Sequence, residues 1–162
     1  MRSPGAQLLV SADSLVQDHQ MMNHSEIEAA LDERHAAAKI AFGNKDTNAY
    51  RSLFSDDLQY VQSDGIMIDK VRLMQSVKTQ FTRLSRADSS FAREKLSIDW
   101  PKVSETLLQL VIAEASAFYL LRRIWRIERR GIYTWALEDR QWKIASVEVL
   151  SENVDSSWKI AR

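Results

Sequence analysis

The sequence of 162 residues contains no cysteine, which excludes disulfide bridges, thiolate metal ligands and thiol-based catalysis. Histidine is scarce as well. His19, His24 and His35 are the three histidines, and no two of them have the His-x-x-x-His spacing, so we expect no metal site. Neither sign of charge is in excess, because 22 basic residues balance 22 acidic ones. This balance gives no electrostatic reason to expect nucleic acid or an anionic membrane as a partner.

Long apolar runs are also missing from the sequence. None approaches the roughly 20 residues that a membrane-spanning helix needs. The opening MRSPGAQLLVSADS has only LLV as an apolar segment, whereas a signal peptide needs about 7 to 15 apolar residues. These absences lead us to expect a cytoplasmic protein.

The length of the chain suits one domain with a sizeable core, and the sequence shows no internal repeat or low-complexity tract. The first residues lack a strong hydrophobic period, so we assign an N-terminal tail to residues 1–22. We assign the domain to residues 23–153 and a C-terminal tail to residues 154–162.

Apolar residues recur at helical spacing in the first half of the domain. Asn23 or Ser25 can cap the first helix, which we expect to end near Phe42, and Asp69 can cap the third. A strand and a short return strand flank the turn sequence SDG. The predicted helices cover about 24–42, 47–54 and 70–84, and the predicted strands cover 58–63 and 66–68.

After the segment SRADSS the hydrophobic period changes from helical to two, which is typical of strands. Helices followed by a run of antiparallel strands predict an α+β fold, with a meander sheet that is covered on one face. The predicted strands cover residues 91–100, 105–121, 126–138 and 141–152.

This order of elements, with the segments YRSLFSDDLQYVQSDG and GIYTWALEDRQWKIASVEV, resembles the nuclear transport factor 2-like superfamily. Within it the chain is most similar to the SnoaL-like small bacterial type, over about residues 24–152. The resemblance implies a cone, also called a cystatin-like fold, in which a curved mixed or antiparallel sheet wraps around about three N-terminal helices and encloses a pocket. It does not imply one activity, because this fold serves isomerases, dehydratases, cyclases, epoxide hydrolases and proteins without a known reaction.

The resemblance can be tested against the ketosteroid isomerases of this fold. Gln62 stands where their aspartate base lies, Ala38 where their tyrosine donor lies, and Tyr133 near their second acid. An amide cannot abstract a proton at neutral pH and alanine cannot stabilise an enolate, so the isomerase set is absent. We also find neither the Asp-Arg-Asp set of the epoxide hydrolases nor the His-Asp pair of the dehydratases at matching strand positions.

Two charged residues fall on faces whose other residues are mostly apolar. Arg34 lies on the apolar face of the first predicted helix, and Glu148 shares strand parity with Ile144 and Leu150. One interpretation is an Arg34–Glu148 pair inside the cone, since buried charges are usually paired. Another is that Arg34 binds a ligand carboxylate through both edges of its guanidinium, and a third is that it reaches the pocket mouth.

The remaining candidates for the pocket are aromatic or polar. Tyr60, Tyr133 and Trp135 have the strand parity of an aromatic lining, and the resemblance adds Gln62. His35 lies one position from the apolar face of its helix, and a histidine at such a position is more commonly a surface residue. The usual pKa of a histidine nevertheless suits proton transfer. We therefore expect Arg34, Tyr60, Gln62, Tyr133, Trp135 and Glu148 to bind a ligand, with His35, Glu148 and Tyr133 as catalytic candidates.

The strand predicted at 105–121 is apolar on both faces, whereas a sheet with one wet face should alternate apolar and polar residues. A partner subunit is the simplest cover, so we expect a homodimer through the outer face of the sheet. Glu114 interrupts this strand, and the sequence does not assign its side. The basic run RRIWRIERR at 122–130 resembles a nucleic-acid surface, but the interleaved Glu128 favours an exposed strand rim guarded by charge.

The sequence favours the first of three classes of function, with no reaction assigned, and the other two stay open as alternatives. The first is a small-molecule-binding protein, whose pocket would take a small hydrophobic or carboxylate-bearing ligand. The second is a lyase, isomerase or cyclase that needs no cofactor and acts on a small hydrophobic or polyketide-like substrate. The third is a non-catalytic module that binds another protein through its sheet.

Overall fold

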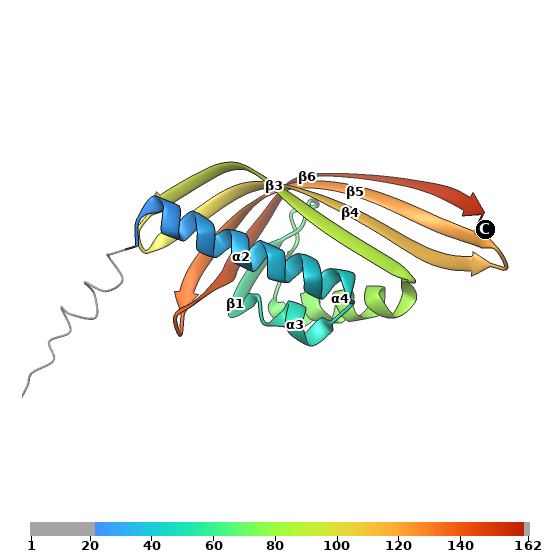
Figure 1. Ribbon diagram of the computed structural model, residues 1–162, viewed down its shortest axis with the longest axis horizontal. Coiled ribbons are helices and arrows are strands. Elements are labelled where there is room, and N and C mark those ends of the chain that lie inside the picture. Colours follow the sequence, from blue (N-terminus) through green and yellow to red (C-terminus); the bar gives the residue numbers. More distant parts are fainter. Residues whose placement is uncertain (1–21, 161–162) are drawn as a thin grey trace, which may run out of the picture.

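The computed structural model describes residues 22–160, so most of the expected tail at 1–22 lies outside the described residues (Figure 1). Within this range the chain forms three helices and one sheet of six strands. The helices are α2 (His24–Gly43), α3 (Thr47–Arg51) and α4 (Lys70–Arg83). The strands are β1 (Phe54–Val61), β2 (Met67–Ile68), β3 (Arg86–Asp99), β4 (Lys102–Phe118), β5 (Leu121–Glu138) and β6 (Gln141–Ile160).

Side-chain caps define where the helices begin. Asn23 accepts a hydrogen bond from the backbone N–H of Glu26 at 2.9 Å, and the Glu26 carboxylate reaches back to the Asn23 backbone, which completes a capping box. Asp69 caps α4 in the same way, through the N–H of Arg72 at 2.8 Å. Both caps confirm the predicted helix starts, and each such cap stabilises its helix by about 1 kcal/mol.

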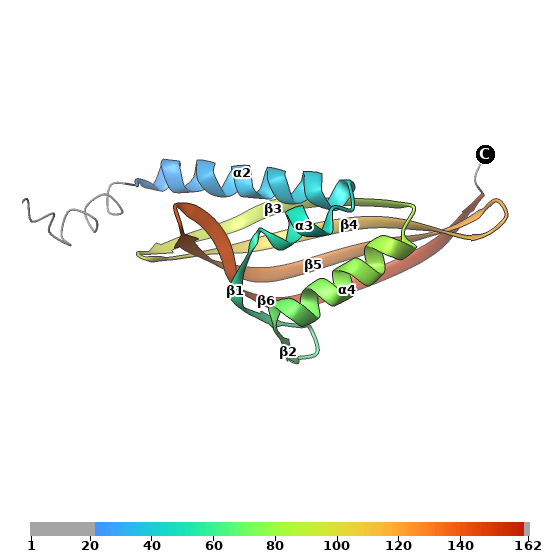
Figure 2. The same cartoon turned by 90° about the horizontal axis from the view of Figure 1, so that it is seen from below.

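The sheet is mixed, with strand order β2-β1-β6-β5-β4-β3. β1 runs parallel to β6, and every other neighbouring pair is antiparallel. The three helices lie on one side of the curved sheet, as Figures 1 and 2 show from two directions. This arrangement confirms the predicted α+β cone.

The core lies between the helices and the sheet face that they cover. Leu31 on α2 and Trp135 on β5 are almost completely buried there. The packing stabilises the fold mainly by removing apolar surface from water. No helix within residues 22–160 is both long and apolar enough to cross a membrane.

Two β-bulges shape β6. Trp135 pairs with Ile144 but Thr134 pairs with Ser146, so Ala145 is an extra residue. A second bulge follows at Leu150, between the residues that pair with Gly131 and Arg130. Each bulge reverses the side-chain parity of the strand and increases its bend, which helps the sheet curve around the helices.

The strands extend further than their local patterns predicted. β3 begins at Arg86 rather than near residue 91, and β6 continues to Ile160. The expected C-terminal tail at 154–162 was therefore wrong as far as residue 160, because Leu121 and its successors on β5 pair with this polar segment. The basic run at 122–130 was wrongly placed on a rim, since β5 is paired with β4 on one side and β6 on the other.

The ends of β4, β5 and β6 project beyond the helices as a three-stranded arm (Figure 1). Large apolar side chains are exposed on it, among them Phe118, Tyr119 and Trp158. The Arg123 guanidinium stacks on Trp125 and Trp158, at 5.5 and 5.4 Å from the ring centres. These cation–π contacts stabilise the packing of side chains on β5 and β6 within the arm.

Candidate functional site

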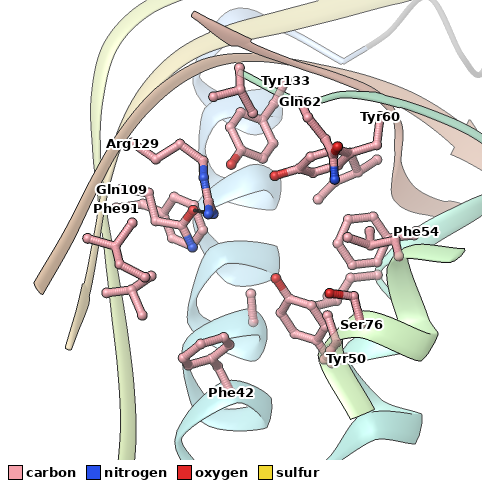
Figure 3. Close-up of a pocket in the computed structure, with 18 of the residues that line it drawn as sticks. Phe42, Tyr50, Phe54, Tyr60, Gln62, Ser76, Phe91, Gln109, Arg129 and Tyr133 are labelled. Carbon is pink, nitrogen blue, oxygen red and sulfur yellow. Dashed lines mark hydrogen bonds between the residues drawn. The ribbon is translucent and has the colours of Figure 1, made fainter. Parts of the chain in front are cut away.

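A cavity of about 390 Å³ lies between the helices and the concave face of the sheet. This volume is within the usual range for small-ligand pockets. Its wall mixes aromatic rings with polar groups, and Figure 3 shows the hydroxyls of Tyr50, Tyr60 and Tyr133 pointing into it beside the Arg129 guanidinium.

His35, on α2, forms one side of this cavity. Its Nε2 lies 2.9 Å from Oε2 of Glu105 on β4, and the Glu105 side chain is inaccessible to solvent. The imidazole also contacts Phe91, at 5.0 Å between ring centres, and Trp135, at 5.5 Å and nearly perpendicular. The ring is thus fixed by one hydrogen bond and two aromatic contacts.

The Glu105 carboxylate accepts two further hydrogen bonds. Trp135 Nε1 donates to it at 2.8 Å and Arg93 Nε donates at 2.7 Å. Burial alone would raise the pKa of Glu105, but the hydrogen bonds from His35, Arg93 and Trp135 and the electrostatic effect of His35 outweigh burial, so the pKa is below its usual value. Glu105 is therefore a buried carboxylate that stays ionised at neutral pH.

Arg93 connects this carboxylate to the surface of α2. Its Nη2 donates to Asp32 at 2.7 Å and its Nη1 to Glu28 at 3.3 Å. Burial lowers the pKa of Arg93, but the hydrogen bonds that Arg93 donates to Glu105 and Asp32 raise it more, so the net shift is upward. The guanidinium holds Glu105 in one position and keeps its charge compensated.

The hydrogen bond to Glu105 determines the protonation pattern of the neutral His35 ring. Because an ionised carboxylate only accepts, Nε2 must carry the proton and Nδ1 has a free lone pair. Among residues 22–160, Nδ1 has no hydrogen-bond partner, and His35 lines the cavity. Nδ1 is therefore the ring nitrogen that can accept a proton.

The three tyrosines of the cavity supply hydroxyl groups. None of the hydroxyls of Tyr50, Tyr60 and Tyr133 bonds to another side chain or backbone group in the described part of the chain, and all three point into the cavity (Figure 3). Burial raises the pKa of Tyr50 to about 12, and burial also raises the pKa of Tyr60 and Tyr133. All three are neutral donors at physiological pH.

These shifts predict late ionisation of tyrosine in the folded protein. The folded-state pKa of Tyr50, about 12, exceeds the unfolded value near 10, so its contribution to stability is complete below about pH 10 and is lost as pH rises through 12. At about pH 11 we expect less tyrosinate absorbance from native protein than from urea-unfolded protein. Coincident titration curves for the two states would contradict the buried placement of these rings.

Arg129, on β5, is the cavity's most tightly held cation. Its Nε donates to Glu152 at 2.8 Å and its Nη1 donates to Gln109 at 3.0 Å. Burial would lower the pKa of Arg129, but Tyr60 and the hydrogen bond to Glu152 raise it more. Arg129 is therefore a fixed positive charge that Glu152 neutralises.

Arg34 differs from Arg129 in having no acidic partner within the described residues 22–160. Its Nη2 donates to the backbone oxygen of Ser52 at 3.3 Å, while its buried Nε has no hydrogen bond. No carboxylate among residues 22–160 lies within 4.0 Å of it. Burial lowers the pKa of Arg34, which reflects the cost of holding the charge there.

The structure brings six of the expected site residues to the cavity, although their roles stay predictions: Arg34, His35, Tyr60, Gln62, Tyr133 and Trp135. Glu148 was wrongly assigned to it. Glu148 is exposed and pairs with Ile132, between the inward Val147 and Val149. The bulge at Ala145 reverses the parity on which the assignment rested, so the Arg34–Glu148 pair does not form.

Sequence reasoning missed Glu105 and Arg93, and with them the His35 pair. A signal was present, because Glu105 shares parity with the inward Leu107 and Val111, where an acidic residue is out of place. Glu114, whose side the sequence left open, lies away from the cavity, 3.6 Å from Arg122 and 4.0 Å from Arg86. No group of three His, Asp or Glu side chains within 22–160 is close enough to hold a metal ion.

No family model matches the sequence, and no curated protein sequence matches it. Solved structures do match the fold. A conserved protein from Planctomyces limnophilus aligns with a TM-score of 0.68 and 14% identity, over 83% of this chain and 100% of that one. A proposed dehydratase of the nuclear transport factor 2-like family from Streptomyces avermitilis aligns with a TM-score of 0.59 and 9% identity, over 78% and 96% of the two chains.

A hexachlorocyclohexane dehydrochlorinase of the type 2 form has the same architecture, with a TM-score of 0.56 and 11% identity over 84% of this chain and 89% of that one. At these identities the likeness concerns the fold alone. The chain therefore has the nuclear transport factor 2-like, or cystatin-like, fold, as its element order predicted. The chemistry has to be argued from the site.

Proposed function

We propose that this protein is an enzyme of the lyase or isomerase type that moves a proton on a small, mainly apolar molecule held in the cavity. The observation that carries the proposal is the His35–Glu105 pair, in which His35 lines the cavity and its Nδ1 has no hydrogen-bond partner among residues 22–160. A packing role for His35 needs no buried, ionised carboxylate behind the ring. A histidine of a cavity wall that is oriented by a buried carboxylate is instead a recurrent feature of catalytic sites.

In the proposed reaction His35 Nδ1 takes a proton from a substrate carbon. In an elimination, the electron pair of the broken C–H bond forms a C=C bond while the leaving group departs with the electron pair of its own bond. In an isomerisation, the C=C bond forms as the π pair of a neighbouring substrate carbonyl moves to its oxygen, and His35 then returns the proton to another carbon. The imidazolium that forms is stabilised by the Glu105 carboxylate 2.9 Å away. Tyr133 is the candidate donor to the developing negative charge, since its hydroxyl has no protein partner and points into the cavity (Figure 3).

The names of two structural neighbours agree with this reaction class. One is a dehydrochlorinase and the other a proposed dehydratase, and both names describe eliminations. A shared fold does not by itself select the enzyme class over the other two classes of function. The main support for an enzyme comes from the hydrogen-bond network of Glu105, which neither a binding protein nor an interaction module requires.

The proposal can be tested on protein purified from its own source. Native mass spectrometry identifies a small molecule retained in the cavity, and that molecule is then incubated in D2O with wild-type protein and with His35→Gln. We expect deuterium incorporation or elimination with wild-type protein only. A molecule that wild-type protein retains unchanged would favour a binding protein instead.

We also propose that the protein is a homodimer joined through the outer face of its sheet. The support is the outward row of β4, where Leu108, Leu110 and Ile112 are apolar and Leu108 is 39% exposed in the single chain. Contiguous exposed apolar surface on a sheet is typical of subunit interfaces.

Leu108→Asp is expected to convert this dimer to a monomer, because it places a charge in the middle of the proposed interface. Analytical ultracentrifugation at micromolar concentration measures the change. Val71→Asp is the matched control, since Val71 is 66% exposed on α4, away from the sheet, and should leave the dimer intact. A wild-type protein that sediments as a monomer would contradict the proposal.

A further inference from the structure

Arg34 holds a positive charge at the cavity wall that the described protein does not neutralise. One hydrogen bond, to the backbone oxygen of Ser52, is its only polar contact among residues 22–160, and its buried Nε is unsatisfied. A buried donor without an acceptor costs stability. A partly buried guanidinium of this kind is suited to an acceptor that a bound molecule brings.

The other charges of the cavity cannot supply this role. Arg129 is bonded to Glu152, so that pair is neutral as a unit. Asp64 belongs to the turn between β1 and β2, where its Oδ1 accepts the N–H of Ile66 at 2.9 Å, and it forms no ion pair with Arg34. Within residues 22–160, Arg34 is therefore the cavity-lining cation that no carboxylate compensates.

We propose that Arg34 is the binding site for the carboxylate of an anionic ring compound, so that the cavity selects small carboxylic acids. The planar guanidinium can bind a carboxylate through two parallel hydrogen bonds. Nη1 is free for this purpose, since it has no partner in the described chain. The rest of the ligand would lie against the aromatic wall of the cavity.

This inference rests on the proposed function, whose substrate class it names. Arg34 and His35 are consecutive residues of α2, and both line the cavity. A carboxylate anchored at Arg34 would hold the body of the ligand within reach of the His35 ring. Arg34 would thus position the substrate, whereas His35 would transfer the proton.

The test compares two probes of nearly the same shape, benzoate and benzamide, by equilibrium binding followed through tryptophan fluorescence and thermal shift. Wild-type protein is expected to bind benzoate at least about tenfold more tightly than benzamide, which is the usual effect of a charged hydrogen-bonded pair. Arg34→Met should abolish that preference. It should also leave Tm unchanged or higher, because it removes the buried and unsatisfied Nε donor.

His35→Gln is the second variant, and it separates this inference from the proposed reaction. It should retain the preference for benzoate even though it lacks a proton-transferring group. The inference is overturned if wild-type protein fails to bind benzoate in preference to benzamide, if Arg34→Met keeps the preference, or if Arg34→Met does not fold. A retained preference without any proton transfer would reject the reaction and leave the carboxylate site intact.

Discussion

Replacing His35 with glutamine is expected to slow proton transfer to and from a molecule in the cavity by about 10²- to 10⁴-fold, the usual contribution of a positioned acid or base. Glutamine is close to histidine in size and can still donate to Glu105. It cannot exchange a proton at neutral pH. The fold should therefore survive while the chemistry is lost.

The rate is measured as deuterium incorporation or elimination by mass spectrometry, with circular dichroism as the check on folding. His24→Gln is the matched control because it makes the same change on the same helix, at a side chain that is 64% exposed. It should have the wild-type rate. A full rate in His35→Gln would remove the histidine from the mechanism.

Replacing Glu105 with glutamine is expected to lower the free energy of unfolding by about 3–5 kcal/mol, the usual cost of removing one partner from a buried ion pair. The Glu105 carboxylate accepts hydrogen bonds from His35, Trp135 and Arg93. An amide directs N–H groups at donors and leaves the Arg93 charge partly uncompensated. Urea unfolding at pH 7 measures the loss.

Asp32→Asn is the control for this substitution, because Asp32 binds the same Arg93 but is 62% exposed. Its effect on the free energy of unfolding should stay below about 1 kcal/mol, as for surface ion pairs.

The pH dependence of stability provides a second check on Glu105. The folded pKa of Glu105 is lowered, so its stabilising effect is present above the ordinary glutamate pKa and is lost as pH falls through the folded value. The difference between wild type and Glu105→Gln should therefore shrink below about pH 4. A difference that is independent of pH would contradict an ionised Glu105.

The fold was predictable because its signals are local. Asn23 and Asp69 begin helices through side-chain caps, and period-two apolar patterns mark the strands. The extent of the strands was less predictable. The end of β6 is polar and serine-rich, and it becomes a strand only because β5 offers a paired edge, which is a tertiary effect.

The site was predictable only in part. Tyr60, Tyr133 and Trp135 face the cavity because strand parity is a reliable guide within an unbroken strand. The side assigned to Glu148 from strand parity was wrong, because no feature of the sequence indicates the bulge at Ala145. The pairing of His35 with Glu105 was beyond local reasoning, since the two residues are 70 positions apart and meet only when α2 packs on the sheet.

The most direct test of this account is nitrogen-15 NMR of histidine-labelled protein, with His35→Gln used to assign the His35 signals among the three histidines. In its neutral form the His35 ring should carry its proton on Nε2, with slow solvent exchange, and its Nδ1 should be unprotonated. This pattern is what a hydrogen bond from Nε2 to the buried Glu105 carboxylate requires. A proton on Nδ1 in the neutral form, or rapid exchange at Nε2, would contradict an oriented base at the cavity wall.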